Sequence, residues 1–346
     1  MTSSVRTQPY AVSAPSRRGS DFAELKRRVQ HAGLLDRRPG RYTARIAFNG
    51  FLLLAGGVAF VLVGDSWWQL LLAGYFGLVF TQLGFLGHDA GHRQVFRSGR
   101  ANDVLGLVHA NLLIGLSFDW WIGKHNRHHS HPNEVERDPD LASGALVWTA
   151  EQAVARRGLG RVIARIQAFL FFPMLLLEAL NLHYASVRAL VAGKGKTRIA
   201  EALMLATHFI AYAVVIFLVM SPLHAVLFIV VQQGVFGVYM GCAFAPNHKG
   251  MPILRPEDEL DYLRRQVLTA RNVSGGWFTQ FALGGLNYQI EHHLFPSMPS
   301  GSLRRCQPLV KAFCRELSLP YAESSAWRSY TEVLRYLHRV AAPLRA

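Results

Sequence analysis

The dominant pattern along this chain is an alternation of long hydrophobic runs with short polar turns. Four runs carry almost no charge: residues 44–64, 69–87, 199–220 and 223–245. Each is about 20 residues long, the length of α-helix needed to cross ~30 Å of hydrocarbon. Short turns join the first run to the second and the third to the fourth. The pattern predicts an all-α integral membrane protein whose four transmembrane helices form two hairpins.

The N-terminal segment, residues 1–43, is polar and rich in arginine. Within it, Phe22, Leu25, Val29 and Leu34 recur at roughly helical spacing. The segment is therefore predicted to be either an amphipathic helix lying on anionic lipid or a partly disordered tail with a solvated, charged face.

After residue 302 the chain is again amphipathic, and a short helix over about residues 330–340 is expected to close it. Together with the hydrophobic runs, this predicts an N-terminal tail (1–43), a membrane domain (44–320) and a C-terminal cytoplasmic helix (321–346).

The charge of the chain indicates its surroundings and orientation. The formal net charge is +15, and with so much apolar sequence this favours an anionic membrane surface over nucleic acid as a partner. The turns at residues 64–68 and 221–222 have no Lys or Arg, whereas the opposite side carries Arg93, Arg127 and Arg188 among others. The positive-inside rule then places that opposite side, and both termini, in the cytoplasm.

The amino-acid usage adds a prediction about the cell. Arg outnumbers Lys, which is typical of a GC-rich genome and favours a bacterial plasma membrane. The chain has three cysteines in no metal-binding spacing, and no secretory signal is visible in its first 40 residues.

Histidines gather in three clusters in the segments beside the hydrophobic runs. Within a cluster they stand at i, i+3 and i+4, or at i and i+4, and these offsets share one face of a helix. Imidazole binds iron, zinc, copper and nickel as the neutral ring. Seven histidines at this spacing predict two metal sites rather than one. The clusters are His88 and His92; His125, His128 and His129; and Gln289, His292 and His293.

The clusters can share a metal centre only if they lie on one side of the membrane. Residues 104–121 and 163–183 are also apolar, but polar side chains interrupt them. If either crossed the bilayer alone, the clusters would be divided between its two faces. We therefore expect both stretches to be interfacial or re-entrant, and all clusters to lie in a cytoplasmic helical cap.

The residue types narrow the choice of metal. No cysteine lies in the clusters, which disfavours iron–sulfur and thiolate zinc sites. Glu-x-x-His pairs, which bridge the two irons in helical bundles, are also missing from them. An all-nitrogen site suits iron, and zinc or copper remain open alternatives.

The three clusters, read with their neighbours, resemble the membrane fatty acid desaturases. The motifs are His-Asp-Ala-Gly-His from residue 88, Lys-His-Asn-Arg-His-His from 124, and Asn-Tyr-Gln-Ile-Glu-His-His from 287. Gln289 in the third motif is similar to the front-end type, in which glutamine replaces the first histidine. The printed sequence has no His-Pro-Gly-Gly motif of the fused haem domain that eukaryotic front-end enzymes usually carry.

The resemblance implies an O2-dependent desaturase with two non-haem iron ions, acting on a long-chain acyl-CoA or acyl-lipid and introducing a cis double bond. It also implies a separate electron donor, either a ferredoxin or a cytochrome with its reductase. His248 matches a further ligand position after the fourth run. Gln289 takes the first position of the third motif, either as a weak ligand or through a hydrogen bond, and Asn247 is a candidate for holding a bound water. The implied ligands and catalytic residues are His88, His92, His125, His128, His129, His292 and His293, with His248 as a metal ligand.

Two other functions fit the same sequence. A hydroxylase or ketolase could use the same scaffold and oxidant, and a non-catalytic membrane protein could hold structural zinc. The mass of the product separates the first alternative from desaturation, because oxygen insertion adds one oxygen and desaturation removes two hydrogens. Metal content and O2 consumption separate the second.

Several polar residues near the clusters have a plainer explanation. His131 falls off the shared helical face, and isolated histidines such as His109, His183 and His208 are expected to be packing residues. Carboxylates near the clusters could orient ligand imidazoles, but each taken alone is expected to be a helix cap or a surface residue. These carboxylates are Asp89, Asp138, Asp140 and Glu291.

Overall fold

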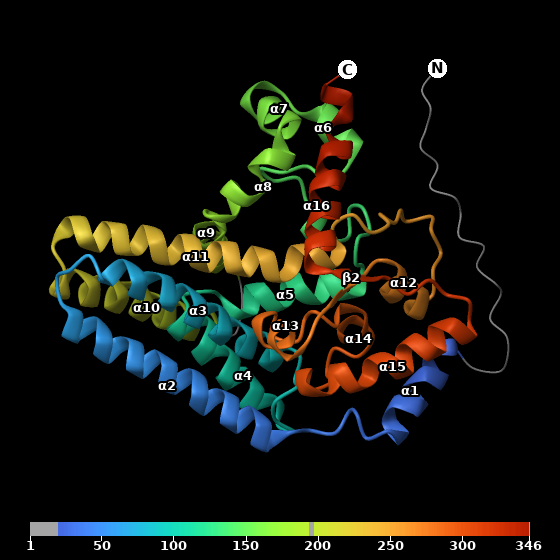
Figure 1. Ribbon diagram of the computed structural model, residues 1–346, viewed down its shortest axis with the longest axis horizontal. Coiled ribbons are helices and arrows are strands. Elements are labelled where there is room, and N and C mark those ends of the chain that lie inside the picture. Colours follow the sequence, from blue (N-terminus) through green and yellow to red (C-terminus); the bar gives the residue numbers. More distant parts are fainter. Residues whose placement is uncertain (1–19, 194–196, 346) are drawn as a thin grey trace.

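Four long helices form a bundle at one end of the molecule. The computed structural model describes residues 20–193 and 197–345, so the first 19 residues of the predicted tail lie outside it. Among the described residues, these four helices are the long unbroken ones apolar enough to cross a membrane. The bundle confirms the predicted fold class, and Figure 1 shows its helices running alongside one another. They are α2 (Pro39–Val63), α3 (Gln69–Gly91), α10 (Arg198–Val219) and α11 (Pro222–His248).

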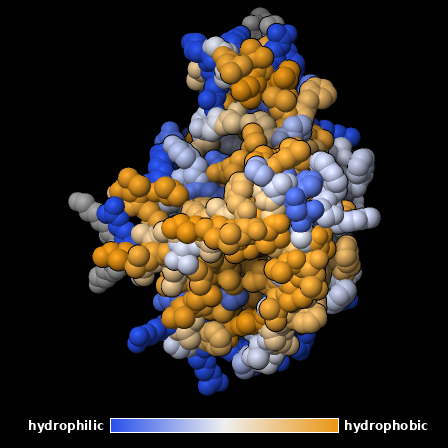
Figure 2. Space-filling view, turned by 90° about the vertical axis from the view of Figure 1, so that its left-hand side faces the viewer, coloured by the Kyte–Doolittle hydropathy of each residue, from blue (hydrophilic) through white to orange (hydrophobic). Residues whose placement is uncertain are grey.

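Close packing inside the bundle depends on small residues, while its outer surface is apolar. A Cβ atom on Gly77 of α3 would lie 2.8 Å from Val235 and 3.0 Å from the Gln232 carbonyl of α11, so glycine allows these two helices to touch. Large side chains such as Leu62 and Leu218 point outward and are about 80% exposed. Figure 2 shows hydrophobic side chains over much of the bundle surface, as expected for a surface in contact with lipid.

Two further apolar stretches are bent helix pairs. The first consists of α4 (Gly99–Leu107), a π-helical segment η1 (Val108–Leu113) and α5 (Phe118–Ser130), and the chain bends by 114° between η1 and α5. The second consists of α7 (Gly158–Arg165) and α8 (Gln167–Leu175), with a bend of 96° between them. Bends of this size fit a re-entrant loop or a broken span, so the interfacial or re-entrant arrangement of residues 104–121 and 163–183 stays a prediction.

Helices that follow the second bent pair connect it to the bundle and to the C-terminus. In Figure 1, α16 stands beside α6–α8 and projects away from the bundle axis. The buried side chains of Phe171 and Leu175 on α8 pack with Val333 and Leu337 on α16. The remaining elements of this region are α6 (Ala150–Ala155), α9 (Glu178–Ala192), α16 (Ala326–Val340), and the 3-10 turns η2 (Pro139–Leu141) and η3 (Ala342–Leu344).

A helical cap covers the end of the bundle at which α3 and α11 finish. The two short strands pair in parallel and join the segment before α14 to the segment before α16. The expected apolar side of the C-terminal amphipathic segment is buried on α15, through Leu303, Val310 and Phe313. The cap contains α1 (Asp21–His31), α12 (Tyr262–Leu268), β1 (Asn272–Ser274), α13 (Trp277–Ala282), α14 (Gln289–Leu294), α15 (Ser300–Glu316) and β2 (Glu323–Ser325).

The N-terminal helix α1 differs from both predictions made for it. Its apolar side is neither on a lipid surface nor in a disordered tail: Leu25, Val29 and Leu34 are buried in the core of the cap. Arg264 of α12 pairs with Asp21 at 2.9 Å and fixes the start of the helix. The amphipathic period was therefore a correct indication of a helix, but the partner that covers it comes from residues 263–314, far away in the sequence.

Candidate metal centre

The histidines of all three clusters meet where the bundle joins the cap. His88 lies in the last turn of α3 and His92 caps that helix, while His248 is the last residue of α11. The second cluster lies on α5 and the third on the short helix α14. Helix ends at one face of a bundle can thus bring together side chains that are far apart in the sequence. His248, which was predicted from resemblance alone, is part of this gathering.

Four histidines form the first group. The side chains of His88, His92, His125 and His292 each offer a ring nitrogen, and these nitrogens all lie within 4.8 Å of one another. The Nε2 atoms of His88, His92 and His292 are buried and have no hydrogen-bond partner among the described residues. Buried polar atoms are normally satisfied, so such a set indicates a site for a positively charged group.

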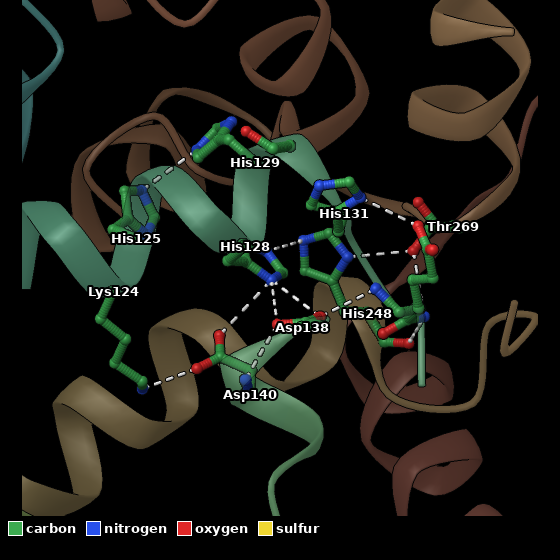
Figure 3. Close-up of polar contacts among 12 residues, drawn as sticks. Lys124, His125, His128, His129, His131, Asp138, Asp140, His248 and Thr269 are labelled. Atoms are coloured by element: carbon green, nitrogen blue, oxygen red, sulfur yellow. Dashed lines mark hydrogen bonds and ion pairs between the residues drawn. The ribbon is translucent and has the colours of Figure 1, made fainter. Parts of the chain in front are cut away.

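Three histidines form the second group, and each is held by its outer nitrogen. The Nδ1 atom of His128 faces Asp138 at 3.0 Å, and that of His248 faces the Thr269 carbonyl oxygen at 2.9 Å (Figure 3). The Nδ1 atom of His293 faces Gln266 Oε1 at 2.9 Å.

Because a carboxylate and a carbonyl can only accept, His128 and His248 must carry their proton on Nδ1. The same follows for His293, since the amide nitrogen of Gln266 donates to the backbone carbonyl of His129 at 2.9 Å and so leaves its oxygen facing the ring.

These tautomers leave unprotonated Nε2 atoms directed at one another. His128 Nε2 and His248 Nε2 are 3.4 Å apart, and neither has a hydrogen to share, so the contact is repulsive unless a cation binds both. Burial, reinforced by the neighbouring imidazoles, holds the pKa of His292 and of His293 well below the usual value. The neutral ring is the form that binds metal, so the donor set fits two metal ions held by nitrogen.

His129 lies between the two groups. Its ring centroid is 4.6 Å from that of His92 in the first group and 4.2 Å from that of His293 in the second. Its Nε2 atom is 3.1 Å from His125 Nε2, and its buried Nδ1 atom has no partner among the described residues. The side chain of His129 is therefore next to both groups, but it is not one of the histidines whose ring nitrogens all lie within 4.8 Å of one another in either group.

The carboxylates near the clusters correct one expectation. Asp89 is not a surface residue: it is buried and accepts hydrogen bonds from Arg45 at 2.8 Å and Ser300 at 2.9 Å, with His88 Nδ1 at 3.3 Å. Asp138 does cap η2, as expected of an isolated carboxylate, but it also holds His128. Both therefore touch a histidine of the centre.

The other two carboxylates behave differently. Asp140 is partly exposed and pairs with Lys124 at 2.6 Å, while its other oxygen is 3.6 Å from His128 Nδ1 (Figure 3). Glu291 is buried, which corrects the surface assignment, yet its oxygens bind Asn272 and Tyr321 rather than a histidine. Burial raises the pKa of Glu291 to about 7, and the two hydrogen bonds oppose this rise.

Gln289 and Asn247 are both buried beside the second group. Gln289 Nε2 is 2.9 Å from His248 Nε2, and Asn247 Nδ2 is 3.2 Å from Gln289 Oε1. His131, which the helical spacing left out, binds Glu134 at 3.0 Å and is absent from both groups. The isolated histidines His183 and His208 bind backbone carbonyls, as expected of packing residues.

Several residues that position the histidines carry no signal in the sequence. Gln266 and Thr269 lie in an ordinary charged segment, and Asn133 is a single polar residue just beyond the second cluster. Asn133 donates from its side chain to the His248 carbonyl at 3.0 Å and from its backbone to Asp138 at 2.8 Å. Only the arrangement in space shows that this one residue connects the second cluster to the end of α11.

Comparison with known proteins gives a consistent result. The model of the fatty acid desaturase family matches residues 65–325, which include all of the clusters. An acyl-lipid (9-3)-desaturase of Physcomitrium patens is 31% identical over 277 residues, covering 76% of this chain and 52% of that protein. A protein of the same description from Borago officinalis is 28% identical, covering 97% and 77%. A Delta(6)-fatty-acid desaturase of Caenorhabditis elegans is 27% identical, covering 99% and 80%. The chain thus spans about half the length of the first relative and roughly three quarters of the others.

Proposed function

Because the chain belongs to the fatty acid desaturase family, we propose that it is an O2-dependent acyl desaturase with two iron ions at the junction of bundle and cap. The observation that carries this proposal is the pair of buried histidine groups, in which the Nε2 atoms of His88, His92, His292 and His293 have no hydrogen-bond partner among the described residues. His88, His92, His125 and His292 would hold one ion, and His128, His248 and His293 the other. His129, which is adjacent to both groups, would complete the set.

When bound, the two irons would allow O2 to act as the oxidant: two hydrogens from the unactivated acyl chain, with two electrons from the external donor and two protons, reduce O2 to two water molecules. The contribution of the protein is to orient the histidine side chains that would hold the two ions. Asp138, Thr269 and Gln266 hold the imidazole rings of the second group with their Nε2 atoms inward. Asp89 approaches His88 from outside, and Tyr42, Arg45 and Ser300 hold that carboxylate in turn.

Aromatic side chains surround the first group and exclude water from it. The indole ring of Trp121 stacks on His125 with ring centroids 4.5 Å apart, and the ring centroid of Phe244 lies 6.3 Å from that of His88. An acyl chain would be directed past these apolar surfaces to the histidines.

The substrate we propose is a long-chain acyl group on CoA or on a membrane lipid, in which a cis double bond is formed on the carboxyl side of an existing one. Support comes from the names of the relatives, which are acyl-lipid (9-3)-, Delta(8)- and Delta(6)-desaturases. The cap and both termini would face the cytoplasm of a bacterial cell. There the net charge of +15 would attract an acidic electron donor such as a ferredoxin.

The test compares the fatty acids of cells that express the wild type, His128→Ala or His131→Ala. His131 is a matched control from the same segment, because it binds Glu134 and lies outside both histidine groups. We expect a new unsaturated methyl ester, lighter by two hydrogens, with the wild type and with His131→Ala, and none with His128→Ala. Fragmentation of the derivatised product gives the position of the bond.

The other outcomes identify the alternatives. A product heavier by one oxygen would make the protein a hydroxylase or ketolase. Purified protein that contains zinc, consumes no O2 with an added reductase and ferredoxin, and gives no product would contradict the proposal and favour a structural metal site. Metal analysis of the same sample therefore accompanies the lipid analysis.

A further inference from the structure

The side-chain amide of Gln289 faces the three-histidine group with its nitrogen. Gln289 is only 3% exposed, and its Nε2 atom lies 2.9 Å from His248 Nε2. In the tautomer fixed by the Thr269 carbonyl, His248 Nε2 has a lone pair and no hydrogen. The amide of Gln289 must therefore donate in this contact.

Asn247 determines which way round this amide lies. Its Nδ2 atom is 3.3 Å from the Ala243 carbonyl oxygen, 3.2 Å from the Leu286 carbonyl oxygen and 3.2 Å from Gln289 Oε1. The two carbonyls can only accept, so they fix the nitrogen of Asn247 at this place. Turning Asn247 over would press its oxygen against both carbonyls and lose both hydrogen bonds.

A fixed Asn247 in turn fixes Gln289. The oxygen of Gln289 faces the donor of Asn247, so its nitrogen is left facing His248. Turning Gln289 alone would bring two amide nitrogens together on one side and an oxygen against the lone pair of His248 on the other. Both contacts are repulsive, so the two amides support one orientation.

An amide nitrogen has no free lone pair and is not a metal ligand, whereas an amide oxygen is. When the lone pair of His248 Nε2 binds the metal, it can no longer accept from Gln289, and this N–H is left for another acceptor. We propose that Gln289 is a hydrogen-bond donor to a small molecule or anion bound at the three-histidine site, oriented by Asn247, and is not a ligand of the metal. This proposal rests on the proposed metal centre. Under this proposal the two metal positions have different surroundings. One has four histidines around it, and the other has three histidines and an adjacent N–H donor.

The test uses purified, oxidised holoenzyme, with iron content and azide binding as readouts that do not depend on turnover. Azide is a small anion that binds open positions on ferric iron and accepts hydrogen bonds. The variants are Gln289→Ala, the nearly isosteric Gln289→Met, and His248→Ala as the control for loss of a ligand. We expect both Gln289 variants to keep the iron content of the wild type and to bind azide about tenfold more weakly, since one bond to a charged acceptor is lost.

Further variants and outcomes separate the possibilities. Asn247→Ala should weaken azide binding to a similar degree without loss of iron, because the amide of Gln289 is then free to turn. If the Gln289 variants lose iron as His248→Ala does, Gln289 is a ligand and the inference is wrong. Full iron with unchanged azide affinity also overturns it. Wild-type protein that holds no iron would instead contradict the proposed metal centre itself.

Discussion

Replacing Asp138 by Asn removes a charge from the support of the second histidine group without changing its shape. Asp138 is 3% exposed, and all hydrogen bonds of its carboxylate are accepted ones. Its oxygens accept from His128 Nδ1 at 3.0 and 3.1 Å and from the backbone N–H groups of Asn133 and Asp140 at 2.8 Å each. Although burial works to raise it, the His128 hydrogen bond keeps the pKa of Asp138 below its usual value, so the carboxylate is charged at neutral pH.

The size of the effect follows from these contacts. Asparagine has one acceptor oxygen where aspartate has two, so its NH2 group must face at least one of the donors. The ring of His128 then loses a charge-assisted bond and part of its orientation, a loss of about 2 kcal/mol. This corresponds to about a 30-fold weaker affinity for iron, within the range usual for groups that support a metal ligand.

Competition with a chelator of known affinity measures this change. Purified wild type, Asp138→Asn and Asp140→Asn are titrated in detergent, and bound iron is determined after removal of the chelate. Asp140 is the matched control: it lies 3.6 Å from His128 and pairs with Lys124, so we expect less than about a threefold effect. Equal affinities for wild type and Asp138→Asn, or an equal loss in Asp140→Asn, would refute the reasoning.

Four further predictions concern helix packing and the orientation in the membrane. Gly115→Ala should lower the free energy of unfolding by about 1–3 kcal/mol, because Gly115 has φ +71° and its Cβ would lie 2.7 Å from a histidine nitrogen. Gly57→Ala, with nothing within 4 Å, should instead raise it by about 0.5–1 kcal/mol; thermal unfolding in detergent measures both. Glu201→Leu leaves three donors of η1, α5 and the turn between them without their acceptor, and the same assay should show a loss of about 3 kcal/mol or more. In a cysteine-free background, an impermeant maleimide should label Trp68→Cys from outside the cell and Arg97→Cys only in inverted vesicles, and the opposite labelling pattern would reverse the proposed orientation.

The sequence predicts those parts of the molecule that depend on local patterns. Hydrophobic runs mark the four membrane helices to within a few residues, except at the start of α2, because lipid solvates a whole helix and the signal is about 20 residues long. The histidine spacing marks one face of α5 and of α14, because side chains three and four residues apart are neighbours on any helix. His248 has no such local pattern and needed the resemblance to a family.

The parts that depend on distant contacts could not be read from the sequence. The outer nitrogens of His248 and His293 are held by Thr269 and Gln266, residues of ordinary type in an ordinary segment. The helical spacing of apolar residues in α1 can be read from the sequence, but this spacing does not indicate whether lipid, solvent or protein contacts the apolar side of the helix. In each case a segment from elsewhere in the chain decides the role of the residue.

The way the second histidine group is put together also determines when it can exist during synthesis. His128 and His248 are 120 residues apart, and His293 is made later still. At 5–20 residues per second, a ribosome needs roughly 6–24 s to pass from His128 to His248. Until α14 follows, neither histidine group is complete, because the first lacks His292 and the second lacks His293. A nascent or prematurely terminated chain therefore exposes an unfinished polar surface at the end of its membrane helices, and the proposed metal positions are complete only in a chain that has been translated at least through the third cluster.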